Sequence, residues 1–279
     1  MIEIGQYHEL EVIKEVDFGL YLAAGEEELL LPLKYIPSGT QVGDILRVFV
    51  YNDGETRPIA TTLEPYATVG EFAFLRVLES SGVGAFLDWG IAKDIFVPFK
   101  EQAQPMRDGR KYVVYVYLDD MTNRVVASSK WNKFISQEPL NEKIGDAVDI
   151  LIAEQTDLGF KAIIHNTHLG LLYTNEIFEP LSIGDSKKGY IKNIREDGKI
   201  DLRLQPFGYE HIDNTKEKIL QELKANNGIL SLGDKSSPEE IYEKLGLSKK
   251  AYKKTIGGLF KDRLIEISDT EIRLISTKK

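Results

Sequence analysis

The chain has 279 residues, of which 42% are hydrophobic and 28% are charged, a composition typical of globular proteins rather than disordered ones. Its net charge of −9 argues against strong nucleic-acid binding by the chain as a whole, because phosphate neutralisation is the main non-specific attraction. The lack of cysteine excludes disulfides, thiolate metal sites and thiol nucleophiles. The start of the sequence has no signal-peptide pattern, and no apolar run reaches the ~20 residues that span a bilayer, so we expect a cytoplasmic protein without membrane contacts.

A glycine pattern occurs three times along the first three quarters of the chain. In each copy an apolar residue precedes a glycine, a second glycine follows 14 residues later, and a third comes 24 or 25 residues after that. The sets are Gly5, Gly19 and Gly43; Gly70, Gly84 and Gly109; and Gly145, Gly159 and Gly184. Between them lie short runs of β-branched and aromatic residues bounded by turn signals. The pattern predicts small closed five-stranded barrels over 1–65, 66–139 and 140–209, with SH3-like barrels or small sandwiches as alternatives.

The sequence from residue 210 to 279 changes to a helical period. In the segment "SSPEEIYEKLGL", Ser237 and Glu240 have the spacing of a capping box, and Gly246 is placed to end that helix. A further helix is expected to begin at a cap provided by Ser248. The segment "IEISDTEIRLI" then alternates around a two-residue turn, as in a β-hairpin. Three helices followed by a hairpin predict a winged helix-turn-helix domain.

The second motif helix of that domain carries a concentration of positive charge. Residues 210–279 hold 14 Lys and Arg against 12 Asp and Glu, whereas residues 1–65 hold 4 against 12. On a helical wheel one arc holds five lysines and a central glycine: Lys249, Lys250, Lys253, Lys254, Gly257 and Lys261. We call this arc the lysine face. A separate arc suited to a core holds Tyr252, Ile256 and Leu259, with Phe260 at its border. The lysine face indicates contact with a polyanion, although an ordinary solvated face is the alternative.

With these residues in view, the chain resembles the conserved virulence factor B family of bacterial S1-domain proteins over essentially its whole length. The most specific segments are "VGDILRVFVYNDGETRPIATT" (42–62), "GYIKNIREDGKIDLRL" (189–204) and "SPEEIYEKLGLSKKAYKKTIGGLFKDRLI" (237–265). The resemblance implies a mainly β chain with an α+β C-terminus, built from three tandem S1-type OB-fold barrels and a winged helix. It also implies a role in RNA binding and gene regulation.

The resemblance further implies aromatic residues that flank the glycine of each second strand and stack on bases. The first copy supplies Phe18 and Tyr21, and the second supplies Phe86, with Trp89 nearby. The third copy combines rings with cations, and its candidate residues are Phe160, Lys161, Tyr173, Lys192, Arg195, Lys199 and Arg203. Strand alternation places Lys192 on the face opposite Arg195.

These features favour a protein that binds single-stranded RNA through the third barrel and the winged helix, and that acts in post-transcriptional regulation. The first two barrels would then be spacers or partner-docking modules. One alternative is a transcription regulator that binds duplex DNA through the winged helix. Another is a scaffold that binds other proteins, including acidic ones.

Catalysis, cofactors and metals are not expected. The sequence has no phosphate-binding loop of the G-x-x-x-x-G-K-[ST] type and no arrangement typical of a nucleophilic triad. His165 and His168 form an H-x-x-H pattern, but we expect it to span a tight turn and not to bind metal.

Overall fold

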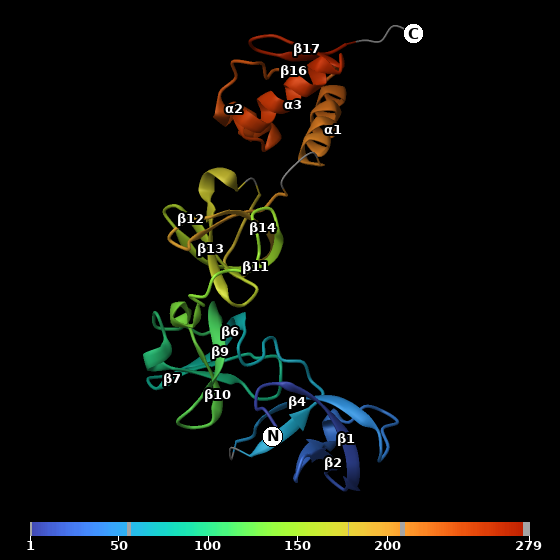
Figure 1. Cartoon of the computed structure of the whole chain (residues 1–279), viewed down its shortest axis with the longest axis vertical. Coiled ribbons are helices and arrows are strands. Elements are labelled where there is room, and N and C mark those ends of the chain that lie inside the picture. Colours follow the sequence, from blue (N-terminus) through green and yellow to red (C-terminus); the bar gives the residue numbers. More distant parts are fainter. Residues whose placement is uncertain (1, 55–56, 178, 207–209, 276–279) are drawn as a thin grey trace. The chain divides into compact units, whose positions relative to one another are not determined.

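Figure 1 shows the chain as a computed structural model, which describes residues 2–54, 57–177, 179–206 and 210–275, the side chains of 210–214 excepted. Contacts divide the chain into two compact units, Met1–Ser136 and Gln137–Lys279. The predicted fold class, three barrel-like sheets followed by a winged helix, is confirmed. The boundaries between domains stay predictions, and the one at 209/210 falls partly outside the described residues.

The first sheet is antiparallel and follows the order β3-β2-β1-β4-β5. Its elements are β1 (Tyr7–Val16), β2 (Gly19–Ala24), β3 (Glu27–Pro32), the 3-10 helix η1 (Leu33–Tyr35), β4 (Ile45–Asn52) and β5 (Pro58–Thr61). The end strands β3 and β5 approach each other. No ladder bond joins them among the described residues, so the closure predicted for this repeat is not made by strand pairing, and packing of side chains such as Leu31 and Ala60 in one core holds the sheet together.

The second and third sheets are closed barrels, as predicted. The second contains β6 (Phe72–Ser80), β7 (Gly84–Leu87), β8 (Ile95–Pro98), η2 (Phe99–Glu101), β9 (Lys111–Asp119) and β10 (Arg124–Ser128), followed by η3 (Trp131–Phe134). The third contains β11 (Ala147–Thr156), β12 (Gly159–Ile164), β13 (His168–Tyr173), η4 (Thr174–Glu176), β14 (Ser186–Ile194) and β15 (Ile200–Arg203). Each is closed by a parallel pair, β8 with β10 in the second barrel and β13 with β15 in the third.

The second glycine of each repeat begins a strand where two backbones touch. A Cβ atom on this glycine would overlap a carbonyl oxygen of the neighbouring strand. The pairs are Gly19 with Leu31, Gly84 with Val97, and Gly159 with Leu172. Glycine is therefore required by close approach of the backbone, which explains its regular recurrence.

The third glycine of each repeat stabilises a bulge in the first strand of its barrel. The register shifts between Val12 and Lys14 in β1, and equivalent shifts occur in β6 and β11. The Gly43 N–H donates to the Val12 carbonyl at 2.8 Å. Gly109 makes the equivalent hydrogen bond within the second barrel, and Gly184 makes it within the third, each also at 2.8 Å. The glycine spacing thus reflects one bulged, sharply curved first strand made three times.

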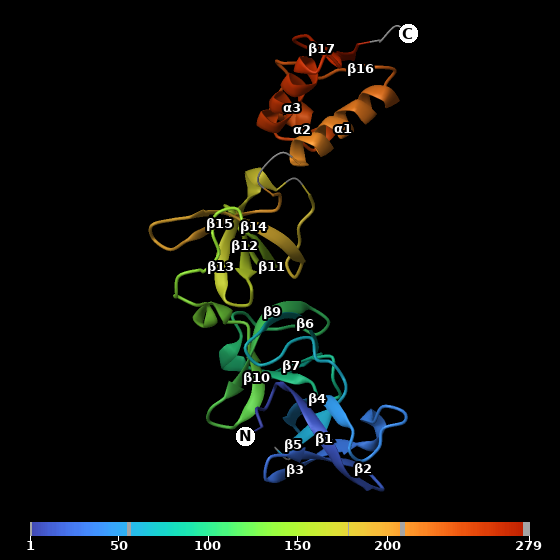
Figure 2. The same ribbon diagram turned by 45° about the vertical axis from the view of Figure 1, so that its right-hand side comes forward.

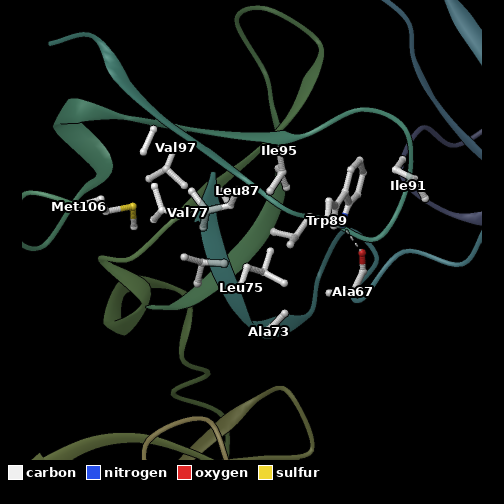
Figure 3. Packing of buried hydrophobic residues seen from close by; sticks show 14 of the residues in the cluster. Ala67, Ala73, Leu75, Val77, Leu87, Trp89, Ile91, Ile95, Val97 and Met106 are labelled. Carbon is white, nitrogen blue, oxygen red and sulfur yellow. Dashed lines mark hydrogen bonds between the residues drawn. The ribbon is translucent and has the colours of Figure 1, made fainter. Parts of the chain in front are cut away.

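The first two barrels share a hydrophobic core. Phe49 and Tyr51 of β4 belong to the same buried cluster as Trp89 and the side chains of β6 to β9. Figure 3 shows Trp89 among side chains that the second barrel contributes to this cluster. Backbone contacts accompany this packing, since the Val69 N–H donates to the Gly5 carbonyl at 3.0 Å. Barrels 1 and 2 are therefore packed as one body and are not two independent modules.

The C-terminal domain has the predicted order of helices and hairpin (Figure 2). Its elements are α1 (Glu210–Ala225), β16 (Ile229–Leu230), α2 (Pro238–Leu245), α3 (Lys249–Lys261), β17 (Ile265–Ile267) and β18 (Ile272–Leu274). The strands form a sheet of order β16-β18-β17. Apolar residues of all three helices share one core with this sheet, among them Ile219, Ile241, Tyr252, Ile256 and Leu259.

The predicted helix ends are confirmed. The Ser237 Oγ accepts the Glu240 N–H at 3.1 Å, and a Glu240 carboxylate oxygen accepts the Ser237 N–H at 2.8 Å, completing the capping box. Gly246 ends α2 in the left-handed conformation with φ 64°. The Ser248 Oγ accepts the Ala251 N–H at 3.2 Å and caps α3. These caps fix the direction in which α3 begins, and so orient its lysine face.

Candidate nucleic-acid interface

Each barrel presents an exposed pair of residues at one equivalent place. The first member precedes the second glycine, and the second member begins the 3-10 helix. A backbone N–H of the second donates to the carbonyl of the first at 2.9–3.1 Å. The pairs are Phe18 and Leu33 in barrel 1, Val83 and Phe99 in barrel 2, and Leu158 and Thr174 in barrel 3. We call the surface around each pair the barrel's stacking face.

The stacking face of barrel 1 contains both predicted rings. Phe18 is 57% exposed, and its ring lies edge-on to that of Tyr21 with centroids 6.4 Å apart. Lys14 places its ammonium 5.5 Å from the centre of the Tyr21 ring. One cation therefore accompanies this pair, within the most acidic quarter of the sequence.

The stacking face of barrel 2 is more aromatic than the sequence indicated. Phe86, the predicted residue, pairs with Phe96 across β7 and β8 with ring centroids 5.0 Å apart. Phe99, which begins η2, adds a ring that is 55% exposed. Neither Leu33 nor Phe99 was among the predicted site residues. The signal that could have found them is a repeated Pro-apolar-Lys tripeptide, 32–34 and 98–100.

Trp89 does not belong to the interface, which corrects the sequence prediction. Its side chain is 2% exposed and lies in the core between barrels 1 and 2 (Figure 3). The indole N–H donates to the Ala67 carbonyl at 2.7 Å, and the indole packs edge-on against Phe49. A ring enclosed in this way has no free face for a base.

Phe160 also differs from its predicted position. It alternates with Lys161 and packs partly against the core of barrel 3, on the same side of β12 as Ala162 and Ile164. The equivalent positions in the other barrels are the buried residues Leu20 and Ala85. Phe160 and Lys161 therefore do not share a face.

A cluster around Tyr173 forms the charged part of barrel 3. The Lys192 ammonium lies 5.8 Å from the centre of the Tyr173 ring, and the Arg195 guanidinium donates to the Tyr173 hydroxyl. The expectation that Lys192 and Arg195 lie on opposite faces is wrong. A bulge between Ile191 and Asn193 shifts the register of β14 by one residue and restores both side chains to one side.

Most predicted cations of barrel 3 have an acidic partner. Arg195 makes two hydrogen bonds to Asp201, at 2.8 and 3.1 Å, which raise the pKa of the guanidinium. The other ion pairs are Lys161 with Glu154, Lys192 with Glu176 and Lys199 with Asp197. Arg203 donates instead to the carbonyls of Gln205 and Pro206. The cationic field of this barrel is therefore largely neutralised by its own carboxylates.

The lysine face of α3 has fewer ion pairs than the cations of barrel 3. Lys253 pairs with Asp234 at 3.0 Å. Within the described part of the chain, the other four lysines of the face have no carboxylate within ion-pair distance: Lys249, Lys250, Lys254 and Lys261. The buried arc opposite is made, as predicted, by Tyr252, Ile256 and Leu259. The sequence prediction that α3 presents one cationic face and one apolar face is thus confirmed.

The wing has the opposite charge. The hairpin formed by β17 and β18 carries Glu266, Asp269 and Glu271. Asp269 pairs with Lys235 at 2.7 Å, and Glu271 pairs with Arg273 at 2.6 Å. Arg273 is the one cation of this hairpin, and it is already paired, so the wing offers phosphates no unpaired positive charge and the favourable potential of this domain is concentrated on α3.

The H-x-x-H pattern spans the turn between β12 and β13. His165 and Asn166 have φ values of 46° and 58°, as expected for a tight connection. Among the described residues, no group of His, Asp and Glu has the arrangement of a metal site. The described helices also include none with the length and apolar character needed to cross a bilayer.

Comparison with known proteins identifies the two ends of the chain. Residues 217–274 match the CvfB-like winged helix domain, and residues 4–63 match the S1 domain. The Bacillus subtilis protein YitL is 28% identical over 277 residues, which cover 92% of this chain and 89% of that protein. Conserved virulence factor B of Staphylococcus aureus is 27% identical over 260 residues, covering 86% of this chain and 81% of that protein.

A solved structure aligns with nearly the whole chain. It is a multidomain protein with nucleic acid binding domains from Streptococcus pneumoniae, 24% identical, with a TM-score of 0.43 and coverage of 98% of both chains. The resemblance to the conserved virulence factor B family rests on the two domain matches and the curated relatives, and it is confirmed.

Proposed function

We propose that this relative of conserved virulence factor B binds single-stranded RNA, with phosphates held by the lysine face of α3 and bases held by exposed apolar side chains of the barrels. The observation that carries the proposal is the set of four α3 lysines that have no carboxylate partner among the described residues, in an otherwise acidic chain. Cations already paired within the protein attract phosphates weakly, whereas unpaired cations release counterions from the nucleic acid on binding.

Exposed rings favour single strands over duplexes. Bases in a duplex are stacked on one another and present only their edges, whereas unpaired bases can stack on aromatic side chains. Phe18 and Phe99 lie on equivalent surfaces of two barrels, each more than half exposed. Because barrels 1 and 2 share a core, their stacking faces are held in a fixed relation to each other.

Barrel 3 has a secondary role in this proposal. Its Tyr173, Lys192 and Arg195 lie together and can contact a nucleotide, but Glu176 and Asp201 reduce their positive potential. We therefore assign the main electrostatic contribution to α3 and a weaker one to barrel 3.

A duplex-DNA-binding regulator is the competing function. The winged-helix fold supports it, because the second motif helix of such domains can enter the major groove. The acidic wing disfavours it, since the wing would lie close to the phosphates on either side of that groove.

The proposal is tested by competition between matched polymers. The full chain is titrated with a labelled single-stranded RNA of mixed sequence, with the DNA of the same sequence, and with the duplex of that DNA. We expect the RNA to bind most tightly and the duplex to compete weakly at 0.15 M salt. Tighter binding of the duplex would establish the DNA alternative, and no binding of any polymer at low salt would favour a protein-interaction scaffold.

In the cell, an RNA-binding protein of this kind would act in the cytoplasm on the use or turnover of transcripts, that is, in post-transcriptional regulation. It would act by binding and not by catalysis, since the proposed contacts hold phosphates by charge and bases by stacking and require no proton transfer or covalent step.

A further inference from the structure

The lysine face of α3 has a bare position at its centre. Gly257 lies in the interior of a 13-residue helix and is exposed, and a Cβ atom added to it would meet no heavy atom within 4 Å. Its φ lies outside the left-handed range. Glycine in a helix interior is less stable than alanine, so the fold of the described chain has no requirement for glycine here and is weakened by it.

The surroundings of Gly257 are cationic on both sides. Lys253 and Lys254 precede it by four and three residues, and Lys261 follows it by four, so all three lie one turn away on the same face. Small residues also occur where two helices pack closely, but among the described residues no other helix lies against Gly257, since an added Cβ atom there would meet nothing within 4 Å. An exposed stretch of backbone with ammonium groups on both sides is instead suited to binding a sugar-phosphate backbone.

An exposed ring lies on the same face. Phe260 follows Gly257 by three residues and is 56% exposed, although its neighbour Leu259 is fully buried in the domain core. Phe260 therefore offers a free ring beside the bare position, within a helical turn of Lys261. A ring, an uncovered stretch of backbone and flanking cations are what one unpaired nucleotide requires for its base, sugar and phosphates.

We infer that Gly257 and Phe260 form a nucleotide subsite on α3, in which the base of an unpaired RNA nucleotide stacks on Phe260 while its sugar-phosphate passes over Gly257. The inference rests on the proposed function and adds to it the binding mode of the helix. In this binding mode α3 contacts single-stranded RNA directly, with lysines holding phosphates on either side. The exposed glycine allows the strand to approach the helix backbone closely.

The first test separates close approach from charge. Gly257→Ala changes no charge, so it should weaken RNA binding by about fivefold or more through lost contact while leaving the salt dependence unchanged. The same substitution should raise the melting temperature of the helical domain by about 2–8 °C, followed by circular dichroism at 222 nm in the full chain. Affinity and stability thus move in opposite directions, which a purely structural role would not produce.

The adjacent glycine is a matched control. Gly258 points to a different side of α3, where an added Cβ would lie 3.1 Å from the flexible end of Lys216. Gly258→Ala should leave RNA affinity within about twofold of the parent protein, because the methyl group that it adds lies outside the lysine face. Equal loss of affinity in both variants would overturn the close-approach inference.

The second test addresses stacking. Phe260→Leu should weaken binding to a mixed-sequence RNA by about fivefold or more, and Phe260→Tyr should restore it, because stacking needs a ring. An RNA of the same length with abasic sites should bind the parent and Phe260→Leu equally.

The failure of the subsite can be told apart from the failure of the proposed function. If replacing Lys250 and Lys254 with alanine weakens binding while both Gly257→Ala and Phe260→Leu leave it unchanged, the subsite is wrong and the proposed function stands. If the parent protein itself does not bind RNA, the proposed function fails first.

Discussion

The indole of Trp89 packs edge-on against the ring of Phe49, with ring centroids 5.3 Å apart and ring planes at 84°. Phe49 belongs to β4 of the first barrel, and Trp89 follows β7 of the second. This pair lies within a continuous core that also contains Tyr51 and Ala67. Two sheets that the sequence presents as separate repeats are therefore joined through two of the largest fully buried side chains of the protein.

Replacing Trp89 with alanine should destabilise both barrels together. Removing a fully buried tryptophan lowers the free energy of unfolding by about 3–5 kcal/mol. Hydrogen exchange followed by mass spectrometry should show faster exchange in β1 and β4 as well as in β6 and β7. Trp89→Phe, which keeps a ring but loses the bond to the Ala67 carbonyl, should give the same pattern with a smaller loss of about 1 kcal/mol. Faster exchange confined to the second barrel would show that the barrels are independent.

The carboxylates of barrel 3 should oppose RNA binding. Glu154→Gln and Glu176→Gln together release Lys161 and Lys192 from their ion pairs. We expect RNA affinity at low salt to rise by about fivefold, because two cations become available to phosphates. The control is Glu9→Gln with Glu11→Gln on β1, which changes the net charge equally in barrel 1. The same gain in both double variants would mean that barrel 3 makes no direct contact.

The capping box of α2 should make the winged helix sensitive to acid. The backbone N–H of Ser237, more than its hydroxyl, lowers the pKa of Glu240 below its ordinary value of 4.5. A carboxyl group whose pKa is lowered by folding stabilises the folded state above its unfolded pKa, and this contribution is lost as the pH falls through the folded pKa. The melting temperature of the helical domain should therefore fall as the pH decreases below 4.5.

Two variants separate the capping box from general acid effects. Glu240→Gln should remove most of this pH dependence while keeping the cap, because glutamine can accept the same bond. Ser237→Ala should lower stability at neutral pH by about 1 kcal/mol. Glu239→Gln, one residue earlier on α2, is the control. A pH profile that is the same for Glu240→Gln and the parent protein would exclude the capping box as its cause.

Local patterns predicted the elements well where each signal is confined to a short segment. The glycine spacing predicted three small barrels because every copy needs the same close strand contact and the same bulge. The lysine face followed from helical periodicity, because Ser248 fixes where α3 begins. Such features depend on neighbours within one or two turns or strands.

Long-range contacts explain what the sequence could not predict. Trp89 looked like a stacking residue because its partner Phe49 lies in another repeat, 40 residues earlier. Strand alternation predicts that Lys192 and Arg195 lie on opposite faces, but this rule applies only where the strand has no bulge. The charge of barrel 3 was overestimated because ion pairs such as Lys161 with Glu154 form between strands whose register the sequence leaves open.

The central claim, that the lysine face of α3 holds RNA phosphates, is tested most directly by the salt dependence of binding. The affinity of the full chain for single-stranded RNA is measured from 50 to 300 mM salt, for the parent protein and for a variant in which the four lysines without an ion pair, Lys249, Lys250, Lys254 and Lys261, are all alanine. Each phosphate contact on a single strand contributes about −0.7 to the slope of log affinity against log salt, so four lost contacts should flatten it by about 3. A folded variant with the slope and affinity of the parent would contradict the claim.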